Sequence, residues 1–531
     1  MLNDNLFVTS YRYIIIIALT ALMSACTTLG PDFEKPEVAV SEQWMDDENS
    51  AIDSKAEDIK AQWWTVFNDP VLDELIDTAY QQNLDLHIAA TRIIEARAQL
   101  GIAVGSLYPQ SQSLVGGATR DHVSQNSFGN FPGLDTSFTS YGVGFDAAWE
   151  LDVWGRLARG IESADNSLLA SVANYDDVLV SLTAEVAVAY VQVRTFEERI
   201  KLATQNEAIQ QRSLTITEVR FNNGATTELD VTQAKALLHS TRALTHSLEI
   251  GLRQSKNALN TLLGLPPGDL SNILTKNGVI PAAPNEVAVG IPIEMLRRRP
   301  DIRQAELQAA AQSALIGVAE GELYPKFGLL GSFGLASNTT GNNNFGDFFS
   351  SDSIVATVGP VFSWSILNYG RIKNDVRVQD ARYQQTIIRY QNSVLLAARE
   401  VEDAMVGFLK AQQQATELAV SVGSSNRSVD LSLIQYRDGV TDYTRVLNSQ
   451  DFLVKQQDSY TAVRGEIALN LISMYKALGG GWEIREGQDF IPVDMREQME
   501  QRTDWGELLD EDPADLKETI ENKDAWRKPD W

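Results

Sequence analysis

Alternating apolar and polar residues near position 145 predict a membrane-spanning β-strand. The apolar residues occupy every second position, namely Tyr141, Val143, Phe145, Ala147, Trp149 and Leu151. Small or polar residues lie between them, and this period of two is typical of a strand with one face in lipid and one in water. The same face returns 215 residues later as Ala356, Val358, Pro360, Phe362, Trp364 and Ile366. A strand of a soluble sandwich would alternate in the same way, but the surrounding chain predicts long helices and no second sheet.

Two proline-free stretches, at about 156–221 and 371–436, predict very long helices. At 1.5 Å per residue each would span roughly 100 Å. No globular core buries a helix of that length, so we expect the helices to pack side by side as in a coiled coil. Shorter helical stretches at about 70–106 and 299–322 end at Tyr-Pro, where proline disfavours a helix. The second of them follows Arg297–Arg299, for which we expect a solvated helix start.

The second half of the chain repeats the first, which predicts two copies of one mixed α and β module. An offset of 216 places Leu107-Tyr108-Pro109 on Leu323-Tyr324-Pro325, and an offset of 215 places Gly155-Arg156 on Gly370-Arg371. Repeat 1 covers 70–266, with strands at about 110–120 and 139–152. A linker at 267–298 leads to repeat 2 at 299–481, with strands at about 326–336 and 353–366. The predicted hairpin loops are 121–138 and 337–352.

Four strands are too few to close a barrel, and lipid does not tolerate an open sheet edge. We therefore expect the chain to oligomerise. A wide lumen needs at least three copies, although closure by itself does not select three.

The N-terminus predicts a lipoprotein. An apolar run at 14–23 is followed by Ser24-Ala25-Cys26, and Cys26 is the only cysteine of the chain. The run has the length of a signal-peptide core and is too short to span a membrane as a helix. We expect a signal peptide at 1–25, lipid on Cys26 and an anchored lead-in at 26–69. Thr27, in place of Asp, resembles the sorting signal of outer-membrane lipoproteins.

Composition and motifs narrow the function classes. A net charge of −27 argues against nucleic-acid binding. Residues 482–531 carry 16 acidic and 7 basic side chains, which predicts a solvated, loosely ordered acidic tail. No apolar stretch of 18 residues follows residue 26, so no membrane-spanning helix is expected. The four histidines lack metal-ligand spacing, so we expect no enzyme, no metal and no cofactor beyond the covalent lipid.

Four motifs together resemble the TolC-like outer-membrane factors, and in particular the NodT-type lipoproteins of resistance-nodulation-division (RND) efflux systems. They are Ala148–Arg156, Leu296–Arg303, Leu323-Tyr324-Pro325 and Leu478–Trp482. The resemblance implies a homotrimer in the outer membrane of a Gram-negative bacterium. It also implies a transmembrane barrel of 12 strands, four from each protomer, continued by a long α-helical barrel in the periplasm.

By the same resemblance, the function is that of a passive exit duct for small molecules such as drugs and toxic compounds. A periplasmic adaptor and an inner-membrane RND transporter would deliver them. Two alternatives stay open. The channel could belong to a protein or peptide secretion system, or the chain could be a lipid-anchored coiled-coil scaffold without a pore, which the alternating strands disfavour.

Two sets of site residues follow. In the resembling family the periplasmic helix tips meet the adaptor and constrict the tunnel. The tip candidates in this chain are Arg220, Gly224, Glu228, Asp230, Tyr436, Arg437, Asp438, Gly439, Asp442, Arg445 and Asn448, the last where the family often has a carboxylate. The polar face of the strand at 141–152 predicts the lumen-facing carboxylates Asp146, Glu150 and Asp152. Three chains would give nine carboxylates and a cation-selective pore.

Overall fold

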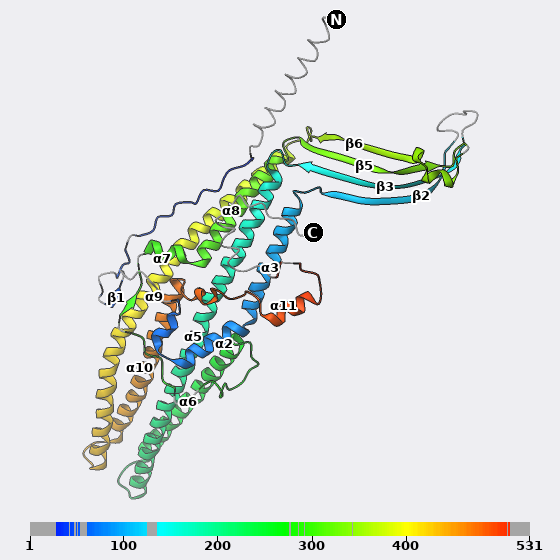
Figure 1. The fold of residues 1–531 in the computed structure, drawn as a ribbon. Coiled ribbons are helices and arrows are strands. Elements are labelled where there is room, and N and C mark those ends of the chain that lie inside the picture. Colours follow the sequence, from blue (N-terminus) through cyan, green and yellow to red (C-terminus); the bar gives the residue numbers. More distant parts are fainter. Residues whose placement is uncertain are drawn as a thin grey trace.

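The protein has a β-sheet at one end, a long bundle of helices at the other and a belt of short elements around the middle of the bundle (Figure 1). The computed structural model describes residues 28–509, with gaps at 42, 47–48, 50, 54–60, 125–134, 275–277, 285, 291, 342 and 507. It does not describe the side chains of residues 53 and 293–295.

The sheet contains four antiparallel strands in the order β2-β3-β5-β6. Their bounds are Ser111–His122 (β2), Ser137–Leu151 (β3), Lys326–Asn338 (β5) and Ile354–Ser363 (β6). The pairing of β3 with β5 joins the two halves of the chain, and β2 and β6 form the two edges of the sheet. Both edges therefore present a row of backbone groups that no other described strand of this chain pairs.

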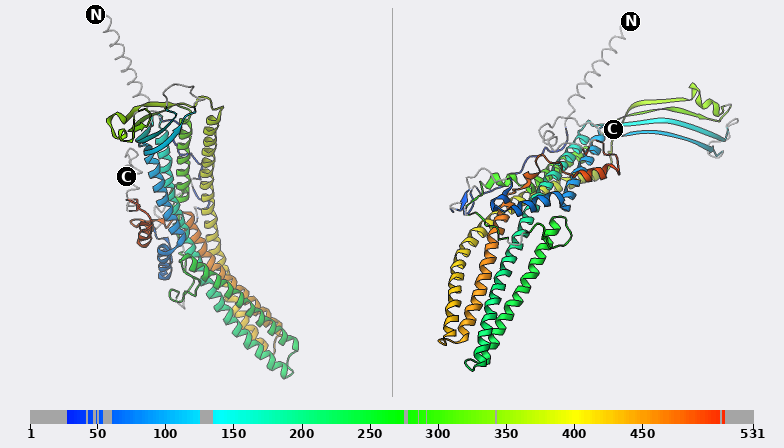
Figure 2. Two further views of the ribbon diagram at one scale, coloured as in Figure 1. Left: turned by 90° about the vertical axis from the view of Figure 1, so that its right-hand side faces the viewer. Right: turned by 60° about the horizontal axis from the view of Figure 1, so that its bottom comes forward.

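Six helices form the bundle, and the two longest run through its whole length. The bounds are Leu84–Gly105 (α3), Arg156–Asn222 (α5), Glu228–Leu262 (α6), Pro300–Gly321 (α8), Arg371–Arg437 (α9) and Tyr443–Ala477 (α10). The helices α5 and α9 have 67 residues each. In the half next to the sheet α8 packs between them, and in the far half α10 takes that place (Figures 1 and 2).

The main buried core lies where the belt packs on the helices of the bundle. Its elements are β1 (Ile52–Asp53), η1 (Trp63–Phe67), α2 (Pro70–Gln82), β4 (Val287–Ala288), α7 (Pro292–Arg298), η4 (Trp482–Arg485) and α11 (Val493–Glu500). Trp63 is fully buried and stacks on Tyr475 of α10, with ring centroids 5.4 Å apart. Asp69 caps α2 through the amide of Val71 and also accepts a hydrogen bond from Tyr190 of α5. These contacts attach the belt to α5 and α10.

The helix predicted at 70–106 is in fact two helices, α2 and α3, which are separated at Asn83. The Asn83 side chain accepts a hydrogen bond from the amide of Leu86 and donates one to the carbonyl of Leu262, at 2.9 Å each. Asparagine is a favoured N-cap because its side chain satisfies an otherwise unpaired helix amide. Since Leu262 ends α6, this break attaches α3 to the far half of the bundle.

The tail predicted to be loosely ordered packs on the protein over residues 482–509. Arg485 forms a bidentate ion pair with Asp176, which is buried in α5. The ring of Phe490 meets Tyr175 edge-on, at a centroid distance of 5.2 Å. Leu509 is buried in the same core. The acidic composition of the tail did not indicate that its apolar residues, such as Phe490 and Leu509, pack on the helices. The rest of the tail lies outside the described residues.

The strands also differ from the prediction at their ends. β2 reaches His122 and β3 begins at Ser137, so both extend into the predicted loop at 121–138. β5 continues to Asn338, and β6 ends at Ser363 instead of 366. Trp364 lies just past β6, where its indole donates a hydrogen bond to the carbonyl of Leu323.

Candidate functional site: sheet faces and helix tips

The register of the sheet places most of the large apolar side chains of the four strands on one face, although Val115, Leu330, Val355 and Val361 lie on the other. Leu114, Phe145, Phe333 and Ala356 form one row across the sheet. Directly paired residues of antiparallel strands point to the same side of a sheet. In this chain Phe333 is 62% exposed and Val358 is 78% exposed. Apart from the turns at Phe345–Phe349 and Ser351–Ser353, no layer of described residues packs on this face, and an apolar face of this extent is suited to lipid and not to water.

Asp146 lies on the opposite, polar face of the sheet. The row that contains it consists of Ser113, Asp146, Ser332 and Thr357. The Asp146 side chain is exposed. Three carboxylates were predicted to face the lumen. Of these, Asp146 alone lies in a strand, on this face, with an exposed side chain.

Glu150 is on the same face but belongs to an ion-pair network where the strands join the helices. Its carboxylate lies 2.7 Å from Nη2 of Arg156, the first residue of α5. Arg156 also approaches Glu322, which accepts a hydrogen bond from Lys326 at 2.7 Å. The two cations offset the two carboxylates, so Glu150 contributes little net charge to the polar face.

Asp152 does not belong to the strand face, so its predicted role is corrected. β3 ends at Leu151, and the Asp152 carboxylate accepts hydrogen bonds from the amides of Leu157 (3.0 Å) and Ala158 (2.7 Å). It therefore satisfies amides in the first turn of α5, where a negative charge is stabilised by the helix dipole. The period-two pattern could not show that the strand had already ended.

The sequence placed Asp121 in a loop, but the structure places it on the polar face near the far end of β2. Its carboxylate accepts hydrogen bonds from the hydroxyls of Thr119 (3.2 Å) and Ser140 (2.9 Å). Ser140 and Asp146 share the even-numbered face of β3, so Asp121 adds a carboxylate toward the loop end of that face. If the alternation of the strand is continued from Ser113, every second residue up to Asp121 lies on the polar face, so the sequence could have predicted this position.

The two helix tips are built in the same way. Gly224 and Gly439 follow the long helices with positive φ angles of 68° and 76°. The amide of Ala225 binds the carbonyl of Arg220, and the amide of Val440 binds that of Gln435, each at 2.8 Å. This is the Schellman arrangement, in which glycine takes the left-handed conformation at no steric cost.

Arg220 connects the two tips. Its Nη1 donates to the carbonyl of Tyr436 at 2.8 Å and to that of Arg437 at 3.2 Å. Its guanidinium also lies over the buried Tyr436 ring, 4.7 Å from the centroid. The carbonyls at the end of α9 carry partial negative charge, so a cation is stabilised at this position.

The other predicted tip residues lie around this contact in several roles. Asp442 caps α10 through the amide of Arg445, and Asp230 accepts a hydrogen bond from Thr226 within its own tip. The Arg437 side chain pairs with its neighbour Asp438. Glu228, Arg445 and Asn448 are exposed. Within one chain, Arg220 is thus the predicted basic residue whose side chain contacts the other helical hairpin, so that the α5–α6 hairpin is joined to the α9–α10 hairpin.

Two further polar contacts join the hairpins along α5 and α10, and sequence analysis missed both. Arg199 binds Asp458 through two hydrogen bonds, of 2.7 and 2.9 Å. Asn206 donates to Gln457 at 2.7 Å. We call these two contacts, together with the Arg220 contact, the hairpin seam. No local motif marks the seam, because its partners lie more than 200 residues apart in the sequence.

The lead-in segment runs along the helices from the sheet end toward β1 (Figure 1). Arg159 of α5 binds the carbonyls of Leu29 and Gly30 and the carboxylate of Asp32. A Cβ atom on Gly30 would lie 2.5 Å from the backbone of Gly317 in α8, so only glycine fits there. Cys26 lies outside the described residues. The segment two residues after it is fixed at the junction of sheet and helices.

Arg299, the residue before α8, is buried. The prediction of a solvated helix start is therefore wrong at this residue. Arg299 donates hydrogen bonds to the carbonyl of Ala477 at 2.6 Å and to the carboxylates of Asp301 and Glu400 at 2.9 Å. Nearby in α5, burial and the charge of Asp301 raise the pKa of Asp177 to about 6, although Arg299 opposes this shift. The belt therefore contains a carboxyl group that titrates just below neutral pH.

Two features of the described residues bear on other functions. The helix α5 contains one stretch long and apolar enough to cross a membrane, but 67% of that stretch is buried inside the protein, as in a core helix. The described residues contain no group of three or more histidine, cysteine, aspartate or glutamate side chains that could hold a metal ion.

A sheet with one lipid-suited face, set on a helical bundle much longer than a bilayer is thick, defines a subunit of an outer-membrane channel. The sequence model of the outer membrane efflux protein family matches residues 75–265 and 291–480. The chain belongs to this family, which consists of transport channels and not of enzymes. It is an outer-membrane efflux component, and the resemblance seen in the sequence is confirmed.

Individual relatives agree with the family assignment. The pyoverdine export outer membrane protein OpmQ of Pseudomonas aeruginosa is 32% identical over 481 residues, covering 87% of this chain and 97% of OpmQ. Nodulation protein T of Rhizobium leguminosarum bv. trifolii is 29% identical, covering 87% and 96%. The solved outer-membrane channel OprN superimposes with a TM-score of 0.79 at 30% identity, covering 86% of this chain and all of OprN.

Proposed function

We propose that three copies of this chain close a 12-stranded barrel in the outer membrane and a periplasmic helical tunnel below it. The observation that carries the proposal is the sheet whose edges, β2 and β6, have no further strand beside them in the described part of the chain. Within a bilayer each unpaired backbone group costs several kcal/mol, so another copy must pair with both edges. Three sheets of four strands give a barrel wide enough for a water-filled lumen.

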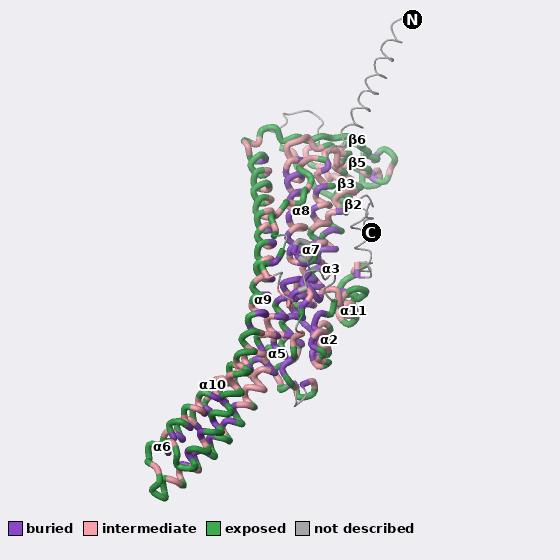
Figure 3. Tube along the Cα trace, turned by 90° about the vertical axis from the view of Figure 1, so that its left-hand side faces the viewer, coloured by how far each residue is buried: buried purple, intermediate pink, exposed green. Residues whose placement is uncertain are grey.

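The helices support the same assembly. Figure 3 shows an exposed face along the half of α9 that lies nearest the sheet. Apolar residues on this face include Val378, Ile388, Leu395 and Leu396. α9 and α3 form opposite edges of this half of the bundle, so the exposed face of α9 fits against α3 of a second copy.

The two halves of the chain descend from one module in this proposal. Asn83 binds the last carbonyl of α6, and Arg299 binds that of α10 at the corresponding place. Trp149 and Trp364 likewise bind the carbonyls of Leu107 and Leu323, each at 3.0 Å. Equivalent residues that make equivalent contacts support a duplication. Two similar modules in each of three chains would place six similar units around the axis of the trimer.

The channel works as a passive duct that needs no cofactor. A periplasmic adaptor binds the tips, and an inner-membrane RND transporter delivers small toxic molecules to the tunnel. The exposed apolar side chains of Leu229 and Val440 at the tips support an adaptor contact, since they are 63% and 75% exposed. Lipid on Cys26 holds the lead-in at the membrane surface.

Native mass spectrometry of the protein extracted in mild detergent tests the assembly. The expected mass is three times that of the lipidated chain, and a monomer that conducts ions in a bilayer would contradict the proposal. A photo-crosslinking amino acid at Val440 tests the partners in cells. Capture of an RND adaptor is expected, whereas capture of a protein-secretion component would favour the secretion alternative.

A further inference from the structure

Four aromatic rings gather at the loop end of the sheet. Phe345, Phe348 and Phe349 belong to η2 (Phe345–Phe349), a turn in the connection between β5 and β6. Tyr141 of β3 completes the cluster, with its ring centroid 4.9 Å from Phe345 and 6.1 Å from Phe348. Phe348 and Phe349 pack edge-on at 5.1 Å. These distances are typical of packed aromatic pairs.

The turn uses its polar groups internally and presents two rings outward. Asn344 and Asp347 form a capping box, and the hydroxyls of Ser350 and Ser353 donate to the Asp347 carbonyl at 2.7 Å each. Only Phe348 is buried, at 8% exposure among the described residues. Phe345 is 54% exposed and Phe349 is 69% exposed. An ordered turn with two exposed phenylalanines is suited to an apolar environment.

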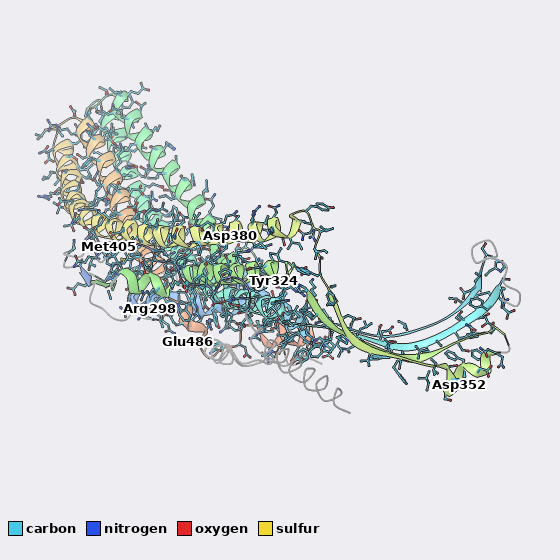
Figure 4. The ribbon with its side chains drawn as sticks, turned by 90° about the horizontal axis from the view of Figure 1, so that it is seen from above. Arg298, Tyr324, Asp352, Asp380, Met405 and Glu486 are labelled. Carbon is cyan, nitrogen blue, oxygen red and sulfur yellow. The ribbon has the colours of Figure 1, made fainter. Side chains whose placement is uncertain are left out.

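The cluster lies on the apolar face of the sheet. Tyr141 shares that face with Phe145, and the turn packs over β5 toward β3, away from the β6 edge. In Figure 4 the sheet is curved, and the segment that carries Asp352 lies on its convex side. A barrel turns its convex side to lipid, so the turn faces the membrane and not the lumen or the neighbouring copy's edge.

Its depth corresponds to the outer boundary of the bilayer. Tyr141 is ten residues from Leu151 along β3, which is roughly 33 Å of strand. With a strand tilt of about 40° this distance spans about 25 Å, the height of the apolar band of outer-membrane barrels. Trp149 and Trp364 mark the periplasmic end of that band. The cluster therefore lies where aromatic side chains are stabilised at the opposite interface.

We propose that η2 is a membrane anchor whose Phe345 and Phe349 side chains insert among the acyl chains of the outer leaflet. The inference rests on the outer-membrane channel described above. It adds a lipid-binding element that the period-two strands do not contain. The anchor would hold the loop end of each protomer at a fixed height in the membrane.

Spin labelling of the full-length protein in liposomes of outer-membrane lipid tests this. The reporter is Phe349→Cys, and the matched control is Asp352→Cys, an exposed position three residues away. Val358→Cys, on the apolar face of β6, reports whether the sheet itself is in lipid. Wild-type protein treated in parallel measures any labelling of Cys26. Accessibility to oxygen, which concentrates in lipid, is compared with accessibility to a water-soluble nickel complex.

Position 349 should resemble position 358, with high oxygen and low nickel accessibility. Position 352 carries a charged side chain in the next turn, Ser351–Ser353, and should be open to nickel at the membrane surface. If the label at position 358 is accessible to oxygen and the label at position 349 is accessible to nickel, the membrane-anchor proposal is wrong and the channel proposal is unaffected. Low accessibility of 349 to both reagents would show protein packing and also overturn the anchor. If 358 reports water, the transmembrane sheet itself fails.

Discussion

Arg220 joins the two tips within one chain by hydrogen bonds, beside the apolar cluster that packs the two hairpins together. Arg220→Ala removes two hydrogen bonds to the end of α9 and the contact with the Tyr436 ring, and should loosen the hairpin seam. We expect conductance in planar bilayers to rise several-fold, and cells to become sensitive to a large antibiotic such as vancomycin. Arg437→Ala is the matched control, because Arg437 pairs with its own neighbour. Equal opening by both variants would contradict the assignment to Arg220.

Asp146 should contribute to the ion selectivity of the barrel together with Asp121, which lies on the same face. Of the three carboxylates predicted for the lumen, Glu150 is paired with Arg156 and Asp152 caps α5. Asp146→Asn should therefore lower the cation preference while Asp121 keeps part of it, measured as a reversal potential in a salt gradient at low ionic strength, where screening is weak. Thr357 lies in the same row, so adding Thr357→Asp to that variant should restore the preference. Failure of this rescue would mean that the polar face does not line the lumen.

Asp177 should make the stability of the belt depend on pH. Its pKa is raised to about 6 by burial and by Asp301, so the folded protein binds a proton that the unfolded chain has already lost above about pH 4. Stability contributed by this proton falls as the pH rises from about 4 to 6. Asp177→Asn should raise the midpoint of thermal unfolding at pH 7.5 and change it little at pH 4. A loss of stability at pH 7.5 would contradict the shift.

Among the elements, the docked C-terminal segment should contribute to stability. Truncation after Gly481 removes the Arg485–Asp176 ion pair and the buried Phe490 and Leu509. It also leaves the Asp176 carboxylate without Arg485 and uncovers the apolar surface on which the segment packs. The truncated protein should unfold at a lower temperature by circular dichroism. The control is truncation after Leu509, which keeps every described contact of the segment and should leave the midpoint unchanged.

At the scale of the elements, the sequence predicted the long helices closely and the breaks poorly. α5 and α9 extend one residue beyond the predicted ends. Their starts and tips are marked locally, by Gly155, Gly370, Gly224 and Gly439. The break at Asn83 depends on the carbonyl of Leu262, which is 179 residues away. A helical pattern continues through residue 83, so local periodicity could not reveal it.

For the whole molecule, the lipid on Cys26 should be separable from folding. The contacts of Leu29, Gly30 and Asp32 with Arg159 hold the lead-in without the anchor. Cys26→Ser should abolish labelling by radioactive palmitate, because the chain has no other cysteine. Heat-resistant oligomers should still form. Thr27→Ala serves as the control and should keep the label, and labelling that persists in Cys26→Ser would contradict the lipoprotein prediction.

The sequence by itself determined the features that depend on neighbouring residues. The period of two gave the lipid face of the strands, and the proline-free stretches gave the long helices. Only the tertiary structure decided which distant groups meet. The pairing of β3 with β5, the contact of Arg220 with the end of α9 and the docking of residues 482–509 join segments well over 100 residues apart. Such contacts depend on packing and register summed over the whole protein, and no local pattern encodes them.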